Sequence, residues 1–356
     1  TDNGDGTITV AAGVTSFNVT IPTSPDSTDE ADETLTLTVG GTAGTGTIID
    51  DDFSPVAMSD VGAVAEDATL TRTALTGVIQ GAPGTDTDGD NTTVSLLVSG
   101  AVAGTGAVTQ GVGVATSLAG TYGHLTLNAD GSYTYVADQS AADALAAGVT
   151  ANDVFTYSVK DPSNNISNTA TLTITVTGTN DAPVLDLDAS SAGTGFATIF
   201  NADNGNPVPI GDVDVSVTDP DNATITSATI TIATNKDGTN DLLIPGTLPV
   251  GITASAYNST TGVMTLSGTA SLASYQAAIR AINFDTTGTS ALARGINVVV
   301  NDGTAASNTA TATISILGAG NAPVLDLDGN DSSGATGTAY LGRYTLGSGG
   351  VAIGDT

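Results

Sequence analysis

Four short runs near the start of the chain alternate between apolar and polar residues, most of the polar ones being threonine. They cover residues 7–10, 16–21, 34–39 and 46–49. Alternation with a period of two is typical of a β-strand that turns one face to a core and the other to water. A β-sandwich usually needs about seven strands and about 100 residues. The pattern therefore predicts only the C-terminal part of a sandwich in residues 1–53, and its other half is expected upstream of Thr1.

The alternation continues in the next segment, residues 54–179. Asp130-Gly131 separates two alternating runs at 125–127 and 133–135, and Asp-Gly between such runs is a strong β-hairpin signal. Residues 155–159 and 171–176 are predicted to be the last two strands of this segment. Unlike residues 1–53, residues 54–179 are therefore expected to form a complete β-sandwich.

Two stretches depart from the strand pattern and predict short helices. Residues 139–147 are rich in alanine and predict one or two helical turns. Within residues 271–282, apolar side chains recur at helical spacing at Leu272, Tyr275, Ile279 and Ile282. An apolar stripe of this kind usually packs on a core, so a short helix that caps one end of a sandwich is expected at 271–280.

A proline motif recurs along the chain and divides it into domains. Asn180-Asp181-Ala182-Pro183-Val184 returns as Asn321-Ala322-Pro323-Val324 after Gly320, and the two prolines are 140 residues apart. Ser-Asn-Thr-Ala-Thr at 167–171 and 307–311 shares this offset. Such self-similarity indicates tandem structural repeats. A related acidic stretch precedes Pro55. The predicted domains are 1–53, 54–179, 180–319 and the truncated start of a further repeat at 320–356.

Composition adds a strong negative charge carried almost entirely by aspartate. The formal net charge is −31, and only three of the 37 acidic residues are glutamates. Aspartate favours turns, caps and the oxygen ligation of hard cations. This charge argues against nucleic acid or an anionic membrane as a partner and favours divalent cations as counter-ions. The chain has no cysteine, so neither disulfides nor a zinc-thiolate site can stabilise it.

Residues typical of enzymes are scarce. His124 is the only histidine, and a general base of this type needs an orienting partner and a nucleophile. Paired carboxylates could hydrolyse glycosides, but the chain has no tryptophan to line a sugar cleft. No run of apolar residues approaches the about 18 of a membrane helix, and no signal peptide is visible at Thr1. We therefore expect a non-catalytic fragment of a longer protein, with no membrane insertion in this segment.

Several ordered motifs resemble known repeats. Asp5-Gly6-Thr7-Ile8, Asp29-Glu30-Ala31-Asp32-Glu33 and Gly46-Thr47-Ile48-Ile49-Asp50-Asp51-Asp52 resemble the Calx-beta-like and immunoglobulin-like repeats of giant bacterial adhesins. Residues 54–179 resemble the cadherin-like repeat of Vibrio, Colwellia, Bradyrhizobium and Shewanella surface proteins. The resemblance implies an all-β chain of tandem Ig/cadherin-like Greek-key β-sandwiches arranged end to end, with one or two short helices. It also implies an extracellular location on a bacterial cell surface.

The cadherin resemblance implies Ca²⁺ at the junctions between sandwiches. Ca²⁺ takes six to eight oxygen ligands from carboxylates, carbonyls and amides. The implied ligands at the junction before the third domain are Glu66, Asp67, Asn180, Asp181, Asp219, Asp221 and Asp302. Those at the junction before the second domain are Asp50, Asp51, Asp52, Asp86, Asp88 and Asp161. Asn321 replaces the carboxylate of Asp181 at the last junction, which then depends on Asp326 and Asp328 and is expected to bend most easily.

Two further acidic stretches are candidates for sites inside single domains. Asp26, Asp29, Glu30, Asp32 and Glu33 resemble the acidic cluster of Calx-beta-like repeats and are candidate ligands. The stretch from Asp86 to Asp90 begins like an EF-hand loop but lacks the glutamate at the twelfth position, so an EF-hand is rejected. Loop aspartates also serve turns and solubility, and only crowded carboxylates point strongly to a cation.

The expected function is that of an extender segment in a repeats-in-toxin-type adhesin, stiffened by Ca²⁺ and supporting attachment and biofilm formation. Its expected partners are neighbouring repeats of the same long chain. Two alternatives stay open: a subunit of an extracellular filament or surface layer that packs against identical chains, and a calcium-dependent module that binds glycan or ice.

Overall fold

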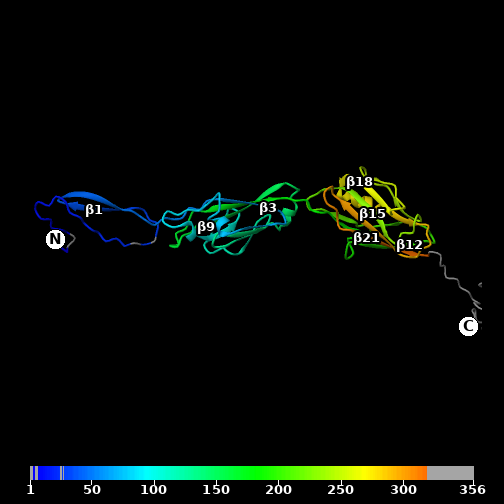
Figure 1. The fold of residues 1–356 in the computed structure, drawn as a ribbon, viewed down its shortest axis with the longest axis horizontal. Helices are drawn as coiled ribbons and strands as arrows, with labels where there is room; N and C mark the ends of the chain where they lie inside the picture. The colour runs from blue at the N-terminus through cyan, green and yellow to red at the C-terminus, as the bar shows by residue number, and fades with distance from the viewer. Residues whose placement is uncertain (1–2, 5–6, 25, 27, 319–356) are drawn as a thin grey trace, which may run out of the picture. The chain divides into compact units, whose positions relative to one another are not determined.

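The computed structural model describes residues 3–4, 7–24, 26 and 28–318 (Figure 1). Contacts divide the chain into two compact units. The first unit contains the described residues up to 64, together with 68–138 and 152–176. The second contains 65–67, 139–151 and the described residues from 177 onward. The expected repeat at 320–356, with its candidate ligands Asp326 and Asp328, lies outside the described residues.

Strands dominate both units, and the all-β fold class is confirmed. Among the described residues there are two α-helices, and both are short: α1 (Ser140–Asp143) and α2 (Leu272–Arg280). Two 3₁₀ turns, η1 (Ala74–Thr76) and η2 (Thr93–Ser95), connect strands of the first unit. The alanine-rich stretch thus forms a single helical turn, as predicted.

The first unit begins with a two-stranded hairpin of β1 (Glu33–Val39) and β2 (Thr42–Ile48). Gly40 and Gly41 connect the strands with positive φ angles of 58° and 82°. The prediction of strands at 7–10 and 16–21 was wrong, since neither run forms one. A strand needs a neighbour for its backbone hydrogen bonds, and alternation alone does not provide it. Apolar residues in these runs are about two-fifths exposed: Ile8 43%, Val10 39%, Phe17 40%, Val19 41% and Ile21 41%.

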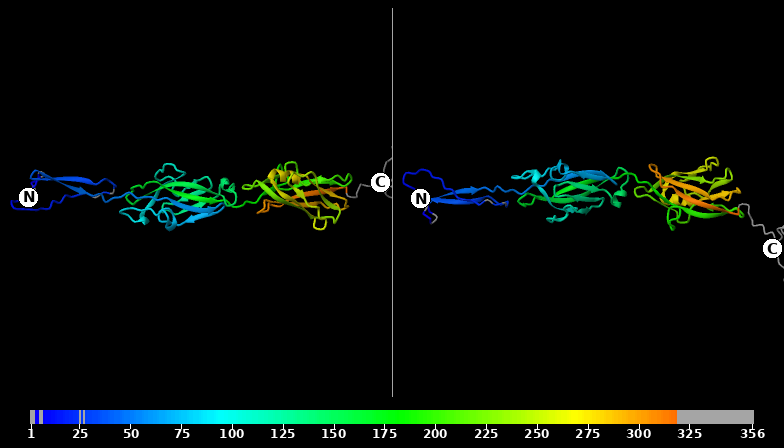
Figure 2. Two further views of the ribbon diagram at one scale, coloured as in Figure 1. Left: turned by 90° about the horizontal axis from the view of Figure 1, so that it is seen from above. Right: turned by 60° about the horizontal axis from the view of Figure 1, so that its bottom comes forward.

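A β-sandwich follows in the first unit, with four strands in each sheet (Figure 2). One sheet has the order β3 (Asp60–Ala65), β10 (Ala170–Thr177), β9 (Thr150–Lys160) and β5 (Leu97–Ala103). The other has the order β4 (Thr69–Arg72), β8 (Tyr133–Val136), β7 (His124–Leu127) and β6 (Ser117–Ala119). Tyr135 and Phe155 meet edge to face in the core, with ring centroids 6.1 Å apart. The predicted Asp-Gly hairpin is confirmed by β7 and β8.

A larger β-sandwich forms the second unit. Its main sheet has the order β12 (Phe196–Asn201), β21 (Ala310–Leu317), β20 (Arg294–Asn301), β15 (Thr224–Thr234), β18 (Val263–Ser271) and β17 (Thr253–Ala254). The facing strands are β13 (Val208–Pro209), β19 (Ile282–Thr286) and β16 (Asp241–Pro245). A short pair joins β11 (Val184–Asp186) to β14 (Ser216–Thr218). In the described part of this unit, β12 and β21 are the one pair of neighbouring strands that run parallel.

Helix α2 covers part of this second core, as its apolar spacing predicted. The Oγ of Ser271 accepts a hydrogen bond from the backbone N–H of Ser274 and so caps the start of the helix. Tyr275 and Ile279 are fully buried in the same cluster as Phe200 and Phe284. The helix therefore packs on its own sandwich.

Candidate metal centre

A buried carboxylate directly follows strand β3. Glu66 is only 3% exposed. Its Oε1 accepts hydrogen bonds from the backbone N–H and the hydroxyl of Thr179, both at 2.8 Å. Its Oε2 is buried and has no hydrogen-bond partner. The chain at 177–179 thus holds the Glu66 side chain in place while leaving one oxygen available to a ligand.

The linker after Thr179 lies against two acidic loops of the same unit. Asn180 Nδ2 donates to Asp302 Oδ2 at 2.9 Å, and the Asn180 Oδ1 accepts from Asn222 Nδ2 at 3.0 Å. The backbone N–H of Asp181 donates to Asp221 Oδ1 at 3.2 Å. We call the following set the second acidic cluster: Glu66, Asn180, Asp181, Asp219, Asp221 and Asp302.

The second acidic cluster contains more negative charge than its protein partners satisfy. Asp219 Oδ2 and Asp221 Oδ2 are buried and unpartnered, as Glu66 Oε2 is. Burial raises the pKa of Asp219 to about 6. Burial, and then the charges of Glu66 and Asp221, raise the pKa of Asp181. Among the described residues, no Lys, Arg or His forms an ion pair with this cluster.

The side chains of the second acidic cluster offer a set of oxygen atoms to a metal ion, and three of its carboxylate oxygens are unpartnered. Such sets suit Ca²⁺, because this ion accepts many oxygen ligands in flexible geometry. Uncompensated like charges are costly when they are buried, and a divalent cation would remove that cost. Of the ligands predicted here, Asp67 is the exception, because its side chain is exposed and its backbone has a φ of 56°. It contributes charge near Asp181.

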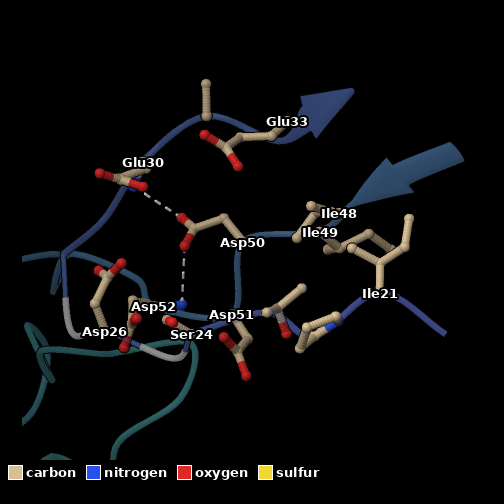
Figure 3. Close-up of a pocket in the computed structure, with 13 residues that line it drawn as sticks. Ile21, Ser24, Asp26, Glu30, Glu33, Ile48, Ile49, Asp50, Asp51 and Asp52 are labelled. Carbon is tan, nitrogen blue, oxygen red and sulfur yellow. Dashed lines mark hydrogen bonds between the residues drawn. The ribbon is translucent and has the colours of Figure 1, made fainter. Parts of the chain in front are cut away.

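A first acidic cluster lies in the first unit (Figure 3) and consists of Asp26, Glu30, Glu33, Asp50, Asp51 and Asp52. Asp50 Oδ2 accepts from the backbone N–H of Glu30 at 2.9 Å, and Asp50 Oδ1 accepts from that of Asp52 at 3.4 Å. Asp29 Oδ2 accepts from the backbone N–H of Ser54 at 3.2 Å. These bonds bring the acidic loop at 26–33 and the linker at 50–54 together, although the sequence suggested two separate sites. A cavity of about 520 Å³ is lined by Asp26, Glu30, Glu33, Asp50, Asp51 and Asp52, among others.

The acidic loop at 88–90 is the counterpart of the Asp219 loop. Val56 pairs with Thr87 as Val184 pairs with Thr218, so Asp88 and Asp90 correspond to Asp219 and Asp221. The N–H of Asp90 donates to Asp88 Oδ1 at 3.3 Å, and that of Asp221 donates to Asp219 Oδ1 at 3.3 Å.

Asp90 was absent from the predicted ligands. Burial, and then the charges of Asp51, Asp50, Asp26 and Asp90, raise the pKa of Asp52. A Cβ added at Gly89 would lie 2.8 Å from the Phe53 side chain, so the loop that carries Asp90 lies beside residues 50–54. Asp88 Oδ2 is buried and unpartnered. The signal in the sequence was the shared Asp-x-Asp-Asn spacing, which ends at Asn91 in the first sandwich and at Asn222 in the second.

Asp86, a predicted ligand, belongs to a different environment. It corresponds to Val217 in the second sandwich and is fully buried. Its Oδ1 accepts from the backbone N–H of Met58 at 2.7 Å, and Tyr157 donates its hydroxyl to Asp60 Oδ2 at 2.9 Å. Burial raises the pKa of Asp86 and of Asp60 to about 7. The strand position thus directs Asp86 to the core.

Asp161 is also buried, but its carboxylate is already satisfied. Oδ1 accepts from the backbone N–H of Asn165 at 2.7 Å and Oδ2 accepts from its side-chain amide at 3.0 Å. Its counterpart Asp302 likewise accepts from its own loop, through the backbone N–H groups of Thr304 and Ala305. Asp302 differs because its second oxygen contacts the linker.

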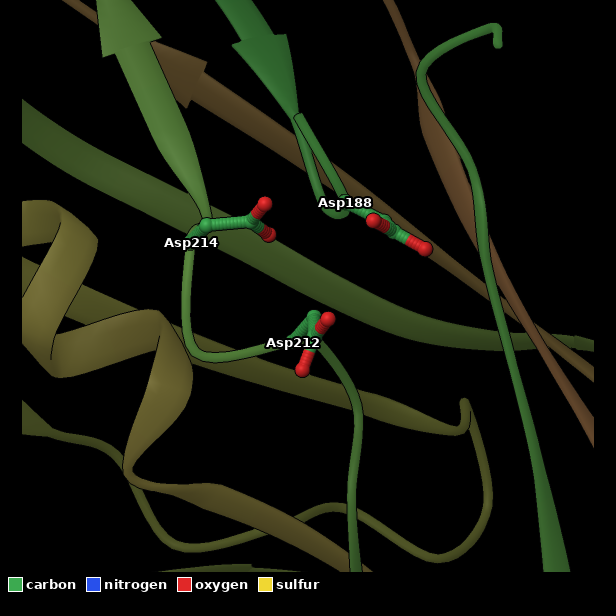
Figure 4. Close-up of side chains that lie close together, drawn as sticks. All are labelled: Asp188, Asp212 and Asp214. Atoms are coloured by element: carbon green, nitrogen blue, oxygen red, sulfur yellow. The ribbon is translucent and has the colours of Figure 1, made fainter. Parts of the chain in front are cut away.

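A third group of carboxylates was not predicted from the sequence (Figure 4). Asp188, Asp212 and Asp214 offer oxygens within 4.8 Å of one another. Asp214 Oδ1 is buried and unpartnered, and the hydroxyls of Ser190 and Ser191 each donate to Asp188 at 2.8 Å. The repeat offset could have revealed this group, because Asp188 is the counterpart of the candidate ligand Asp328.

Part of the chain is similar to a known protein family. Residues 52–178 match the family model of the bacterial cadherin-like domain, a structural and adhesion-type extracellular module. No curated protein matches the chain. None of the helices in the described residues is long and apolar enough to cross a membrane.

Solved structures resemble this chain only remotely. The protocadherin GammaB4 extracellular domain is 13% identical, with a TM-score of 0.28, covering 77% of this chain and 36% of its own. The human desmocollin-1 ectodomain is 14% identical, with a TM-score of 0.26, covering 79% of this chain and 45% of its own. The chain thus spans less than half the length of either. The tandem Ig domains of DIP-gamma are 10% identical, with a TM-score of 0.30, covering 74% of this chain and 98% of their own. The match to a family model covers residues 52–178, where the chain resembles a bacterial cadherin-like domain.

Proposed function

We propose that the chain is a non-catalytic extracellular segment in which Ca²⁺ stiffens the linkers between successive β-sandwiches. In this role it would act as the extender of a bacterial surface adhesin and support cell attachment and biofilm formation. The observation that carries the proposal is Glu66, which is 3% exposed and has a buried oxygen without a partner. The same oxygen-only environment contains Asp181, Asp219 and Asp221.

Charge repulsion is the physical basis of this function. Without a cation, the carboxylates of the second acidic cluster would repel one another, and this repulsion would loosen the linker around Asp181. Ca²⁺ binding would convert this repulsion into shared coordination. Because the ligands come from residues far apart in the sequence, one ion would fix the linker, the residue after β3 and the Asp219 loop together. Ion binding to the native state also raises its stability by linkage.

The residues present fit Ca²⁺ better than other metals. The chain has no cysteine and a single histidine, so sites with nitrogen or sulfur ligands are not available to zinc or copper. Carboxylates, amide oxygens and backbone carbonyls remain, and these are the ligands of hard cations. The partners in this proposal are neighbouring repeats of the same chain.

Small-angle scattering and thermal unfolding, each with Ca²⁺ and with a chelator, test the proposal. We expect chelation to reduce the maximum dimension and to lower the melting temperature. An unchanged maximum dimension and an unchanged melting temperature would refute calcium stiffening. A concentration-dependent increase in mass would instead favour the assembly of identical chains in a filament or layer.

A further inference from the structure

The repeated Ser-Asn-Thr-Ala-Thr motif places an asparagine side chain against the same backbone position in both sandwiches. In the second, Asn308 Oδ1 accepts from the N–H of Leu185 at 2.9 Å, and its Nδ2 donates to the Leu185 carbonyl at 2.9 Å. In the first, Asn168 makes the same two bonds with Ala57, at 3.0 and 2.9 Å. Leu185 and Ala57 each stand two residues after the proline that ends the linker.

The serine of the motif closes the loop that carries the neighbouring aspartate. Ser307 Oγ accepts from the N–H of Val300 at 3.0 Å and donates to the carbonyl of Asn308 at 2.7 Å. Ser167 Oγ makes the same contacts with Val159 and Asn168, at 2.9 and 2.6 Å. In both sandwiches the Ser-Asn pair therefore connects the chain after the linker to the loop before the last strand.

An amide side chain is the group that this position requires. Leu185 is fully buried and lies in β11, which forms a two-stranded sheet with β14. Buried backbone groups need hydrogen-bond partners. The Asn308 amide offers one donor and one acceptor together, as a residue of an adjacent strand would, whereas aspartate only accepts and alanine does neither.

We infer that Asn308 is a positioning residue that holds the linker in place whether or not an ion is bound. The linker is attached to one loop at two points, by Asn180 to Asp302 and by Leu185 to Asn308. The Asn308 side chain, which makes the second attachment, bonds to Leu185 and to none of the six members of the second acidic cluster. It therefore acts by placing Asn180 and Asp181. This inference rests on the proposed calcium function, because it assigns to the Ser-Asn pair the preorganisation of that site.

Two measurements on the full chain test the inference. The first is the exchange rate of the Leu185 amide hydrogen, followed by NMR in chelator. The second is the Ca²⁺ dissociation constant and stoichiometry from calorimetric titration. For Asn308→Ala we expect the Leu185 amide to exchange at least about tenfold faster and Ca²⁺ to bind about tenfold more weakly at an unchanged number of ions.

Matched variants separate the possible causes. Thr309→Ala, a truncation of the exposed neighbouring residue, should leave both measurements unchanged. Asn308→Asp keeps the acceptor but loses the donor, and it should also weaken Ca²⁺ binding. Asn168→Ala should speed exchange at Ala57 and leave Leu185 unaffected.

The outcomes distinguish this inference from the proposed function. The inference would be overturned if the Leu185 amide hydrogen exchanged at the same rate in Asn308→Ala as in Thr309→Ala. Faster exchange with an unchanged dissociation constant would also overturn it, because the contact would then not position the site. If the unaltered chain binds no Ca²⁺, the proposed function fails, while the exchange rate in chelator still decides whether Asn308 holds the linker.

Discussion

Replacing Glu66 by glutamine should have opposite consequences with and without Ca²⁺. The substitution preserves the shape of the side chain and the acceptor for the two bonds from Thr179. It removes one of the negative charges that surround Asp181 and replaces the unpartnered Oε2 by an amide. In chelator, the variant therefore loses a buried, uncompensated charge. In Ca²⁺, it loses a charged ligand.

The magnitudes follow from the burial of this group. A buried polar atom without a partner costs about 1–3 kcal/mol, and more when it is charged. The variant keeps a buried polar atom at this place and loses only its charge, so we expect Glu66→Gln to be more stable than the unaltered chain in chelator by about 1 kcal/mol. For a domain of this size, that is a rise of about 2–4 °C in melting temperature for each kcal/mol. Each tenfold loss of Ca²⁺ affinity then removes about 1.4 kcal/mol of this advantage at saturating Ca²⁺.

Differential scanning calorimetry in chelator and in excess Ca²⁺ measures both effects. Asp67→Asn is the matched control, because it removes the same charge from the exposed adjacent residue and asparagine tolerates the positive φ. The control should change either melting temperature only slightly. The reasoning is refuted if Glu66→Gln is less stable than the unaltered chain in chelator, or if Ca²⁺ raises both melting temperatures equally.

Two further predictions concern the first unit. Asp90→Asn should weaken Ca²⁺ binding at the first acidic cluster by about tenfold or more, because a carboxylate ligand becomes neutral. Asp86→Asn should leave this binding unchanged. Equal effects of the two substitutions in a calcium titration would contradict the role given to Asp90. Asp60 has its pKa raised to about 7 by burial, above the about 3.9 of an unfolded chain, so the native state holds more protons between these values. Stability of the unaltered chain should therefore fall as pH rises from about 4 to about 7, and urea unfolding should show a smaller fall for Asp60→Asn.

Local patterns predicted those elements whose formation depends on nearby residues. The Asp-Gly hairpin between β7 and β8 formed, and so did helix α2, because turn chemistry and helical spacing act over a few residues. The runs at 7–10 and 16–21 have an equally clear alternation but form no strand. Alternation identifies a face that can be buried, but the strand also needs a partner.

The candidate site was likewise predicted only in part from local sequence patterns. The density of aspartates near Asp50 and Asp219 predicted where carboxylates gather. It did not show which aspartate of the run from Asp86 to Asp90 faces the linker, because that depends on the pairing of Val56 with Thr87. Asp188 escaped prediction for a related reason, since its neighbours Asp212 and Asp214 are distant in sequence and are brought near by the fold.

The sequence by itself determined the all-β class, the tandem repeats and the oxygen-rich chemistry, because strand period, repeat offset and residue type are properties of the chain read locally. Only the tertiary structure decided that Glu66 has a buried oxygen without a partner, although it lies 113 residues from Thr179. It also decided that the repeated asparagine bonds to the backbone after the linker. Both features depend on which distant segments pack together, and packing is settled by the whole core rather than by any single motif.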